Sequence, residues 1–208
     1  MKTARRLSVL TAAAALLFSS GPVANAETIV RKSISYFQIG GTTAEDLDRE
    51  LERRGPVTRT SGSRHPGATQ IKFGGELSYV QSAAQCRLGD INVTLTTRII
   101  LPKWKNRKKA HGDLALIWDA LSSDIKRHEE RHAEIAQQHA RKLERTLKRL
   151  RPQRNCEIMQ AKVAEATDKL ISAHDAAQMN FDRVEAVNFD KRMIRILEYR
   201  AKRNPPKN

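Results

Sequence analysis

The sequence predicts an α+β fold in which a small antiparallel sheet and one short helix pack against a long antiparallel helical hairpin. Strand-like stretches fill the first half of the chain and end in an alternating apolar–polar segment over residues 86–101. Residues 113–150 contain neither proline nor glycine, and Pro152 separates them from a second long helical stretch. A short joint between two long helices favours antiparallel packing.

The first 26 residues predict a cleavable signal peptide. A basic start, an apolar run too short to span a bilayer and a small-x-small site follow one another: Lys2, Arg5 and Arg6, residues 7–18, and Ala24-Asn25-Ala26. We therefore expect export to the periplasm or beyond, a mature domain over residues 27–190 and a basic, fraying tail over residues 191–208. No later stretch is apolar enough for a transmembrane span.

The two cysteines, Cys86 and Cys156, both lie in the expected mature part. In an oxidising compartment such a pair is expected to form a disulfide bond. Closing a loop of this length stabilises a fold by about 4 kcal/mol in the chain-entropy model. Two cysteines so far apart in sequence are a poor zinc site, so we do not count them as metal ligands.

The chain is strongly basic, with a formal net charge of +15. Residues 1–26 contain three basic residues and no acidic one, which leaves +12 on the remainder. Such a charge favours anionic partners, among them envelope polymers and lipid head groups. Expected export argues against nucleic acid as the physiological partner.

The elements of the first half follow from local signals. Residues 29–39 are rich in β-branched and aromatic residues, which predicts a strand that ends at a Gly40-Gly41 turn. Thr42 or Thr43 is placed to cap a helix, with Glu45 or Asp46 completing a capping box. This helix carries Leu47 and Leu51 inward and ends at Gly55-Pro56. The sequence then predicts an exposed loop, a strand, a turn and two further strands, over residues 58–67, 69–73, 74–75, 77–81 and 86–101.

The second half predicts two helices, over residues 113–150 and from residue 156 to 189 or beyond. Apolar residues or histidines recur at steps of three or four in the first: Ile117, Leu121, Ile125, His128, His132, Ile135, His139, Leu143 and Leu147. The second repeats the pattern at Met159, Val163, Ala166, Leu170, Ala173, Ala177 and Val184. Both stripes are expected to face the core.

The first long helix contains the pattern His-Glu-x-x-His, formed by His128, Glu129 and His132. Positions four apart share one face of a helix, so both imidazoles can ligate one metal ion. Glu129 is then placed to take a proton from a water on that ion, which is the chemistry of a zinc peptidase. The alternative is that Glu129 is a solvated ion-pair partner of the arginines around it.

A catalytic zinc ion usually has three protein ligands. His139 lies about 10 Å along the axis from His132, and residues 133–138 contain no glycine to end the helix between them. On the returning helix the level of the two histidines falls near residue 174, where a polar stripe contains His174, Gln178, Asp182 and Glu185. His111 approaches only if its loop folds back, and His65 lies in an exposed loop.

The chain resembles a bacterial family, domain of unknown function 922, whose members are described as predicted secreted zinc-dependent proteases. Several short pieces carry the resemblance through their common order: Tyr36 to Leu47, Gly55-Pro56, Cys86, Leu101-Pro102 followed by Trp104, Trp118, His128-Glu129 with His132, and Cys156. The resemblance implies an exported metalloprotease-like fold with its two cysteines paired. It also implies zinc on His128 and His132, with Glu129 as the general base.

One segment departs from the family pattern. Near its end the family shows an aromatic residue and aspartate followed by Thr-x-His-Gly. Here Phe181-Asp182 matches the pair, but Glu185-Ala186-Val187-Asn188 replaces the rest, so valine stands at the histidine position. We therefore predict Asp182 as the third ligand, with Glu185 and His174 as alternatives.

Two functions follow as hypotheses. The first is an exported zinc metallopeptidase that hydrolyses protein or peptide bonds in the cell envelope, with a cell-wall peptide among the candidate substrates. The second is a non-catalytic basic envelope protein that binds anionic polymers through its helices. The presence or absence of a complete set of zinc ligands separates the two.

Overall fold

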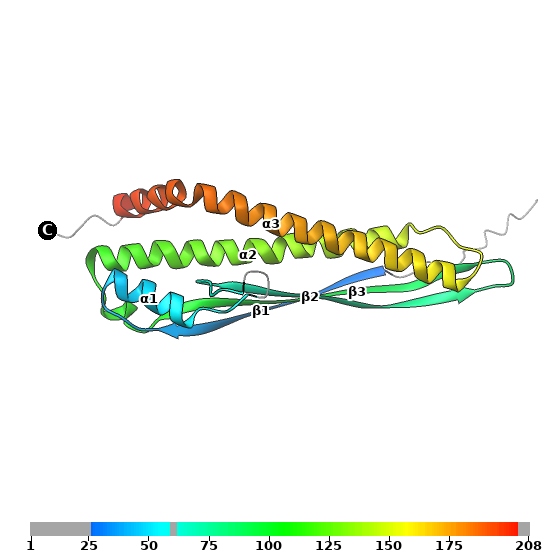
Figure 1. Ribbon diagram of the computed structural model, residues 1–208, viewed down its shortest axis with the longest axis horizontal. Coiled ribbons are helices and arrows are strands. Elements are labelled where there is room, and N and C mark those ends of the chain that lie inside the picture. The colour runs from blue at the N-terminus through cyan, green and yellow to red at the C-terminus, as the bar shows by residue number, and fades with distance from the viewer. Residues whose placement is uncertain (1–25, 59–61, 204–208) are drawn as a thin grey trace, which may run out of the picture.

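The computed structural model describes residues 26–58 and 62–203. Its elements are β1 (Ala26–Ile39), α1 (Ala44–Arg54), β2 (Ala68–Gln81), β3 (Cys86–Trp104), a 3-10 turn (Arg107–Lys109), α2 (Gly112–Lys148) and α3 (Cys156–Arg203). Figure 1 shows an elongated layered molecule, in which α2 runs along the sheet and α3 runs back along α2. The expected signal peptide lies outside the described residues, apart from Ala26.

The sheet is mixed, so the prediction of an antiparallel sheet was wrong in one strand. Its order is β1-β3-β2, with β2 antiparallel and β1 parallel to the central strand. A parallel pair needs a crossover connection, and here α1 and β2 together form it. The long alternating segment predicted from the sequence is the central strand β3, in which Leu95 and Ile99 are fully buried.

The turn expected at Gly74-Gly75 is absent, because β2 runs through both residues. A Cβ on Gly75 would lie 2.3 Å from the carbonyl oxygen of Asn92 on β3. This glycine therefore permits a close approach of two strand backbones. A glycine pair within a strand and a glycine pair in a turn have the same local sequence signal.

Helix α1 begins and ends where the sequence predicts. Thr43 is its N-cap, and the side chain of Asp46 accepts the backbone N–H of Thr43 in return, which completes a capping box. Leu47 and Leu51 are buried, and they pack with Trp104 against the end of the sheet.

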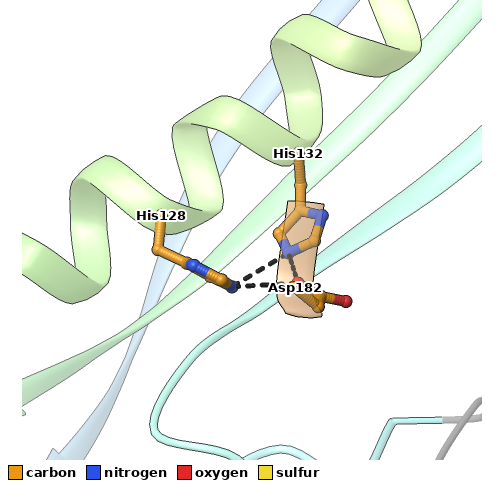
Figure 2. A group of neighbouring side chains, drawn as sticks. All are labelled: His128, His132 and Asp182. Carbon is orange, nitrogen blue, oxygen red and sulfur yellow. Dashed lines mark hydrogen bonds and ion pairs between the residues drawn. The ribbon is translucent and has the colours of Figure 1, made fainter. Parts of the chain in front are cut away.

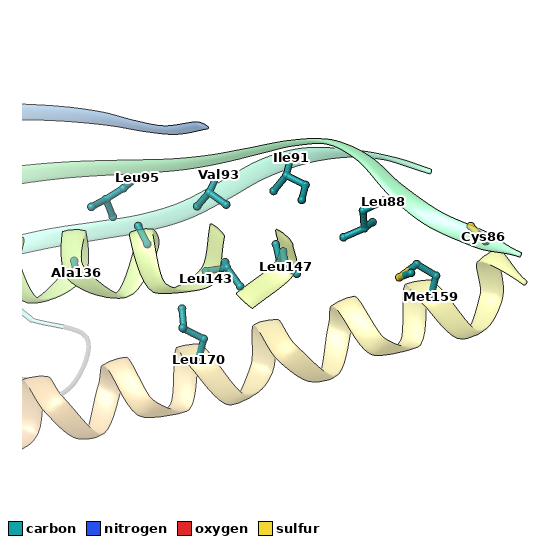
Figure 3. Packing of buried hydrophobic residues seen from close by; sticks show 11 residues of the cluster. Cys86, Leu88, Ile91, Val93, Leu95, Ala136, Leu143, Leu147, Met159 and Leu170 are labelled. Carbon is teal, nitrogen blue, oxygen red and sulfur yellow. The ribbon is translucent and has the colours of Figure 1, made fainter. Parts of the chain in front are cut away.

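The largest apolar cluster among the described residues lies between β3 and the ends of α2 and α3 that are close to the cysteines. Figure 3 shows this cluster, in which Leu143 and Leu147 of α2 meet β3 and Met159 and Leu170 of α3. The expected disulfide between Cys86 and Cys156 is present and ties β3 to the start of α3. This end of the hairpin is therefore held by apolar contacts and one covalent link.

Helix α2 uses more than one face, and its buried face differs from the predicted stripe. Ile117 was expected inside but is 41% exposed, whereas Trp118 is buried. Glu129 is 6% exposed, whereas His128 and His132 are only partly buried. Because α2 contacts the sheet and also α3, Glu129 lies against Thr69 of β2 while His128 and His132 reach toward Asp182 of α3.

Helix α3 continues to Arg203, through most of the tail that was expected to fray. Its buried residues, Met159, Leu170 and His174, all belong to the first half. The second half exposes apolar side chains, including 76% of Val187. In place of a core, Asp124 on α2 pairs with Arg192 at 2.8 Å, and Glu185 pairs with Arg127. Among the described residues, none of the helices is apolar over a length sufficient to cross a membrane.

Candidate metal centre

Three potential metal ligands converge where α2 and α3 cross. His128 and His132 lie one turn apart on α2, and the antiparallel return of the chain places Asp182 of α3 beside them. One ligand atom from each lies within 4.8 Å of the others. Figure 2 shows the two imidazoles and the carboxylate pointing toward one another. The structure therefore brings together the three residues that the sequence predicted as ligands.

The separations of these atoms fit a single small ion. The Nε2 atoms of the two histidines are 3.0 Å apart. An Oδ1 oxygen of Asp182 lies 2.9 Å from His132 Nε2 and 3.4 Å from His128 Nε2. Tetrahedral zinc with bonds of about 2.1 Å holds its ligand atoms roughly 3.4 Å apart. The donor set of two imidazoles and one carboxylate also suits zinc and leaves a fourth position for water.

Gln178 fixes the orientation of the His132 ring. Its amide nitrogen donates to the carbonyl of His132 at 3.1 Å and contacts His174 Nε2 at 2.8 Å. Its amide oxygen therefore faces His132 Nδ1, at 2.6 Å, and accepts a hydrogen bond from it. This bond places the ring hydrogen on Nδ1 and leaves Nε2 as an acceptor.

The consequence is that two acceptors face each other at the centre of the cluster. His132 Nε2 and the Asp182 carboxylate oxygen are 2.9 Å apart, and neither carries a hydrogen when His132 is neutral. Two acceptors at this distance repel unless a cation, either a proton or a metal ion, lies between them. A proton or a metal ion at the point where the three ligand atoms meet would remove this repulsion.

Burial favours the neutral form of His128. Burial, with the neighbouring His132, lowers the pKa of His128 below its ordinary value, although Asp182 and Glu185 act in the opposite direction. Phe181 stacks on this ring, with centroids 4.9 Å apart, and meets His132 edge-on. A neutral imidazole is the ligating form, so a lowered pKa favours metal binding at neutral pH.

Glu129 points from α2 toward the sheet and is held by Thr69 of β2. The Thr69 hydroxyl lies 2.8 Å from the Oε2 carboxylate oxygen of Glu129 and 2.8 Å from its backbone carbonyl. Burial raises the pKa of Glu129, while the hydrogen bond from Thr69 and the charge of His132 lower it in part. Glu129 thus has a raised pKa and belongs to the same motif as the two histidines. A raised pKa is a property of carboxylates that act as general bases.

Gly67 makes room for this carboxylate. A Cβ on Gly67 would lie 3.0 Å from both Cγ and Oε1 of Glu129 and 2.8 Å from Cγ2 of Ile125. A side chain at residue 67 would therefore require both Ile125 and Glu129 to shift. The sequence did not identify Gly67 or Thr69 as site residues, because their link to Glu129 spans about sixty residues.

The other candidates lie outside the cluster. Glu185 is 3.7 Å from His128 Nδ1 and is shared with Arg127 and Arg192, so its charge is already compensated. His174 is buried, packs edge-on against Phe73 and contacts Asp175, at 2.9 Å.

The three remaining histidines are also elsewhere. His139 contacts the carbonyl oxygen of Ile135 at 2.8 Å, and His65 lies 3.2 Å from Ser63. His111 stands at the N-cap position of α2, where its side chain makes no capping hydrogen bond.

Fold and site together define a mixed α+β protein with a histidine–histidine–carboxylate cluster between two antiparallel helices. The chain belongs to the family described as bacterial protein of unknown function, DUF922, whose sequence model matches residues 34–189. The match begins within β1, ends within α3 and includes every residue of the cluster. No curated protein and no solved structure matches the chain.

Proposed function

We propose that this protein is a zinc-dependent peptidase, with His128, His132 and Asp182 as its ligands. The observation that carries the proposal is the contact between His132 Nε2 and the Asp182 carboxylate, two acceptors 2.9 Å apart beside a second imidazole. A bound cation explains this contact. The nature of the donors and their near-tetrahedral spacing favour zinc.

When bound, zinc would supply Lewis-acid chemistry, which polarises a carbonyl group and makes a water molecule more acidic. The chain's own residues orient the ligands and shield the cluster. Gln178 holds the His132 ring in its ligating tautomer, and Phe181 covers the face of His128. Asp182 has a side chain that is 55% exposed, so a substrate can approach the cluster from this side.

Glu129 acts as the general base. Its burial raises its pKa, so the carboxyl group can accept a proton from the attacking water and return it to the leaving amine near neutral pH. Thr69 holds the carboxylate, and Gly67, which has no side chain, leaves room for it. Both are positioning residues, because they contact Glu129 and not the reacting atoms.

Export and an envelope substrate are part of the proposal. A basic start, an apolar run and a small-x-small site support cleavage after Ala26 and release outside the cytoplasm. The Cys86–Cys156 disulfide agrees with an oxidising compartment. Proteins or peptides of the envelope, including cell-wall peptides, are then the substrates within reach.

Cleavage of casein and of a peptide library by the purified protein, compared with Glu129→Gln, tests the enzyme. The substitution keeps the size of the side chain and removes the base, so we expect a loss of about a hundredfold or more in rate at unchanged zinc content. Equal rates in both proteins would remove Glu129 from the mechanism. No cleavage by a zinc-loaded protein would favour the alternative, a non-catalytic basic envelope protein.

A further inference from the structure

A large cleft lined by arginines lies between α2 and the second half of α3. Its volume is about 730 Å³. Nine residues line it: Ser123, Asp124, Arg127, Arg192, Arg195, Ile196, Tyr199, Arg200 and Arg203. Five arginines and one aspartate leave a formal charge of +4 on its walls. Such a concentration of guanidinium groups in a concave surface attracts anions.

The arginines of the cleft differ in how far their charge is compensated. Arg127 and Arg192 pair with Asp124 and Glu185. Across residues 26–58 and 62–203, no carboxylate forms a salt bridge with Arg195, Arg200 or Arg203. Arg200 donates to the Ser123 hydroxyl at 3.0 Å, and Arg203 donates to the Tyr199 hydroxyl at 2.5 Å. The charge of Arg200 also acts on Asp119, so Arg195 and Arg203 are the least compensated of these three arginines.

The cleft adjoins the metal cluster. Arg127 lines the cleft and directly precedes His128, and its guanidinium contacts Glu185, whose carboxylate is 3.7 Å from His128 Nδ1. The arginines from 192 to 203 extend over eleven residues of α3, or about 16 Å at the helical rise. An extended peptide covers this length with about five residues.

The chemistry of the walls favours a peptide with carboxylate side chains. Guanidinium groups bind carboxylates in a two-pronged geometry, and arginine is the residue suited to this. Ile196 and Tyr199, the latter 59% exposed, offer apolar surface for the aliphatic parts of glutamate side chains. A ligand made only of phosphates would make no apolar contact with that surface.

We propose that this cleft binds an acidic segment of the peptide substrate, on one side of the bond presented to the His128–His132–Asp182 cluster. The proposal rests on the proposed peptidase function for its substrate, but binding in the cleft does not require the metal. The enzyme would therefore prefer peptides with several aspartates or glutamates beside the cleaved bond.

Binding of labelled ten-residue peptides to the purified Glu129→Gln protein, measured by fluorescence anisotropy in EDTA, tests the cleft apart from catalysis. The peptides carry four glutamates, four glutamines or four lysines. We expect the acidic peptide to bind tightest, and Arg195→Gln with Arg200→Gln to weaken it about tenfold. The matched control is Arg141→Gln with Arg145→Gln, two exposed arginines on α2 far from the cleft, which should leave binding unchanged.

Melting temperature and circular dichroism verify that both double variants are folded. If the two double variants weaken peptide binding equally, the proposal is overturned, because the attraction would then come from the overall positive charge of the protein. Polyphosphate binding that depends on Arg195 and Arg200, without binding of the acidic peptide, would overturn it in favour of a phosphate polymer. If the protein binds the acidic peptide but neither retains zinc nor cleaves peptides, the proposal for the cleft stands and the proposed peptidase function is refuted.

Discussion

The two ends of the α2–α3 hairpin are held together by different forces. Next to the disulfide, Leu143 and Leu147 pack with Met159 and Leu170 in a continuous apolar core. At the opposite end α3 has no buried residue, and its ion pairs to α2 centre on Asp124. The candidate metal cluster lies between the two regions. An apolar end fixes the register of the helices, and a polar end leaves charged groups and a cleft available for binding.

Removing the disulfide should have the largest effect on stability. Cys86→Ser with Cys156→Ser releases a loop with a sequence separation of 70 residues, which costs about 4 kcal/mol in unfolding free energy. Urea unfolding under oxidising conditions measures it. Zinc content of the folded fraction should remain unchanged, since the cluster is not attached to this bond. A simultaneous loss of zinc would show that the two regions are coupled.

Gly67→Ala should lower peptidase activity with little loss of zinc. The new methyl group would lie 2.8 Å from Ile125 Cγ2 and 3.0 Å from Glu129 Cγ and Oε1, so both side chains would have to shift. A small displacement of the base costs up to about tenfold in kcat. Gly74→Ala is the matched control, because a Cβ there meets no atom within 4 Å. Similar activity in both variants would contradict the placement of Glu129 against residue 67.

Asp124→Asn should weaken the ion-paired end by about 2 kcal/mol, since it removes the charge shared by Arg127 and Arg192. Burial raises the pKa of Asp124, but hydrogen bonds from Arg192 and Arg127 outweigh burial and the net pKa is lowered. A carboxyl group whose pKa is lower in the folded state stabilises at pH values above its unfolded pKa of about 4 and loses this contribution as pH falls further.

Urea unfolding from pH 7 down to pH 3 therefore checks the direction in which Asp124 makes stability depend on pH. The wild-type protein should lose more stability than Asp124→Asn as the pH falls below about 4. Parallel curves for the two proteins would mean that Asp124 carries no charge-dependent stabilisation.

Thr69→Val should have the smallest effect among these changes. It removes the hydroxyl that lies 2.8 Å from the Glu129 carboxylate, so one buried oxygen loses its partner at a cost of about 1 kcal/mol. We expect roughly fivefold slower cleavage and a higher apparent pKa on the acidic side of the rate profile. Thr96→Val, at an exposed strand position, is the control. An unchanged profile would remove Thr69 from the site.

The sequence predicted the elements whose signals are local. The capping box at Thr43, the breaks at Gly55-Pro56 and Pro152, and the alternation along β3 each depend on a few neighbouring residues. The disulfide followed from composition and compartment. Pairing of β1 with β3 depends on contacts between distant segments, and the local pattern of a strand does not state its direction.

The site residues also divide into those that have a local sequence signal and those that depend on contacts between distant segments. His128 and His132 were predicted from their spacing. Asp182 was predicted because it matches the family's aromatic–aspartate pair and lies on the polar stripe of the returning helix. The sequence did not predict that Glu129 would be buried against β2, because the apolar stripe gave α2 one inward face where the structure has two. It also missed the arginine cleft, since the tail that forms one wall was expected to fray.

The central claim is that His128, His132 and Asp182 hold one zinc ion. Its most direct test is the zinc content of the purified wild-type protein, His132→Ala and Asp182→Ala, measured by mass spectrometry after dialysis against zinc-replete and then zinc-free buffer. We predict about one ion per chain in the wild type, near zero in His132→Ala and a strong reduction in Asp182→Ala. A wild-type protein that retains no zinc would contradict the claim and assign the positive charge in the cluster to a proton.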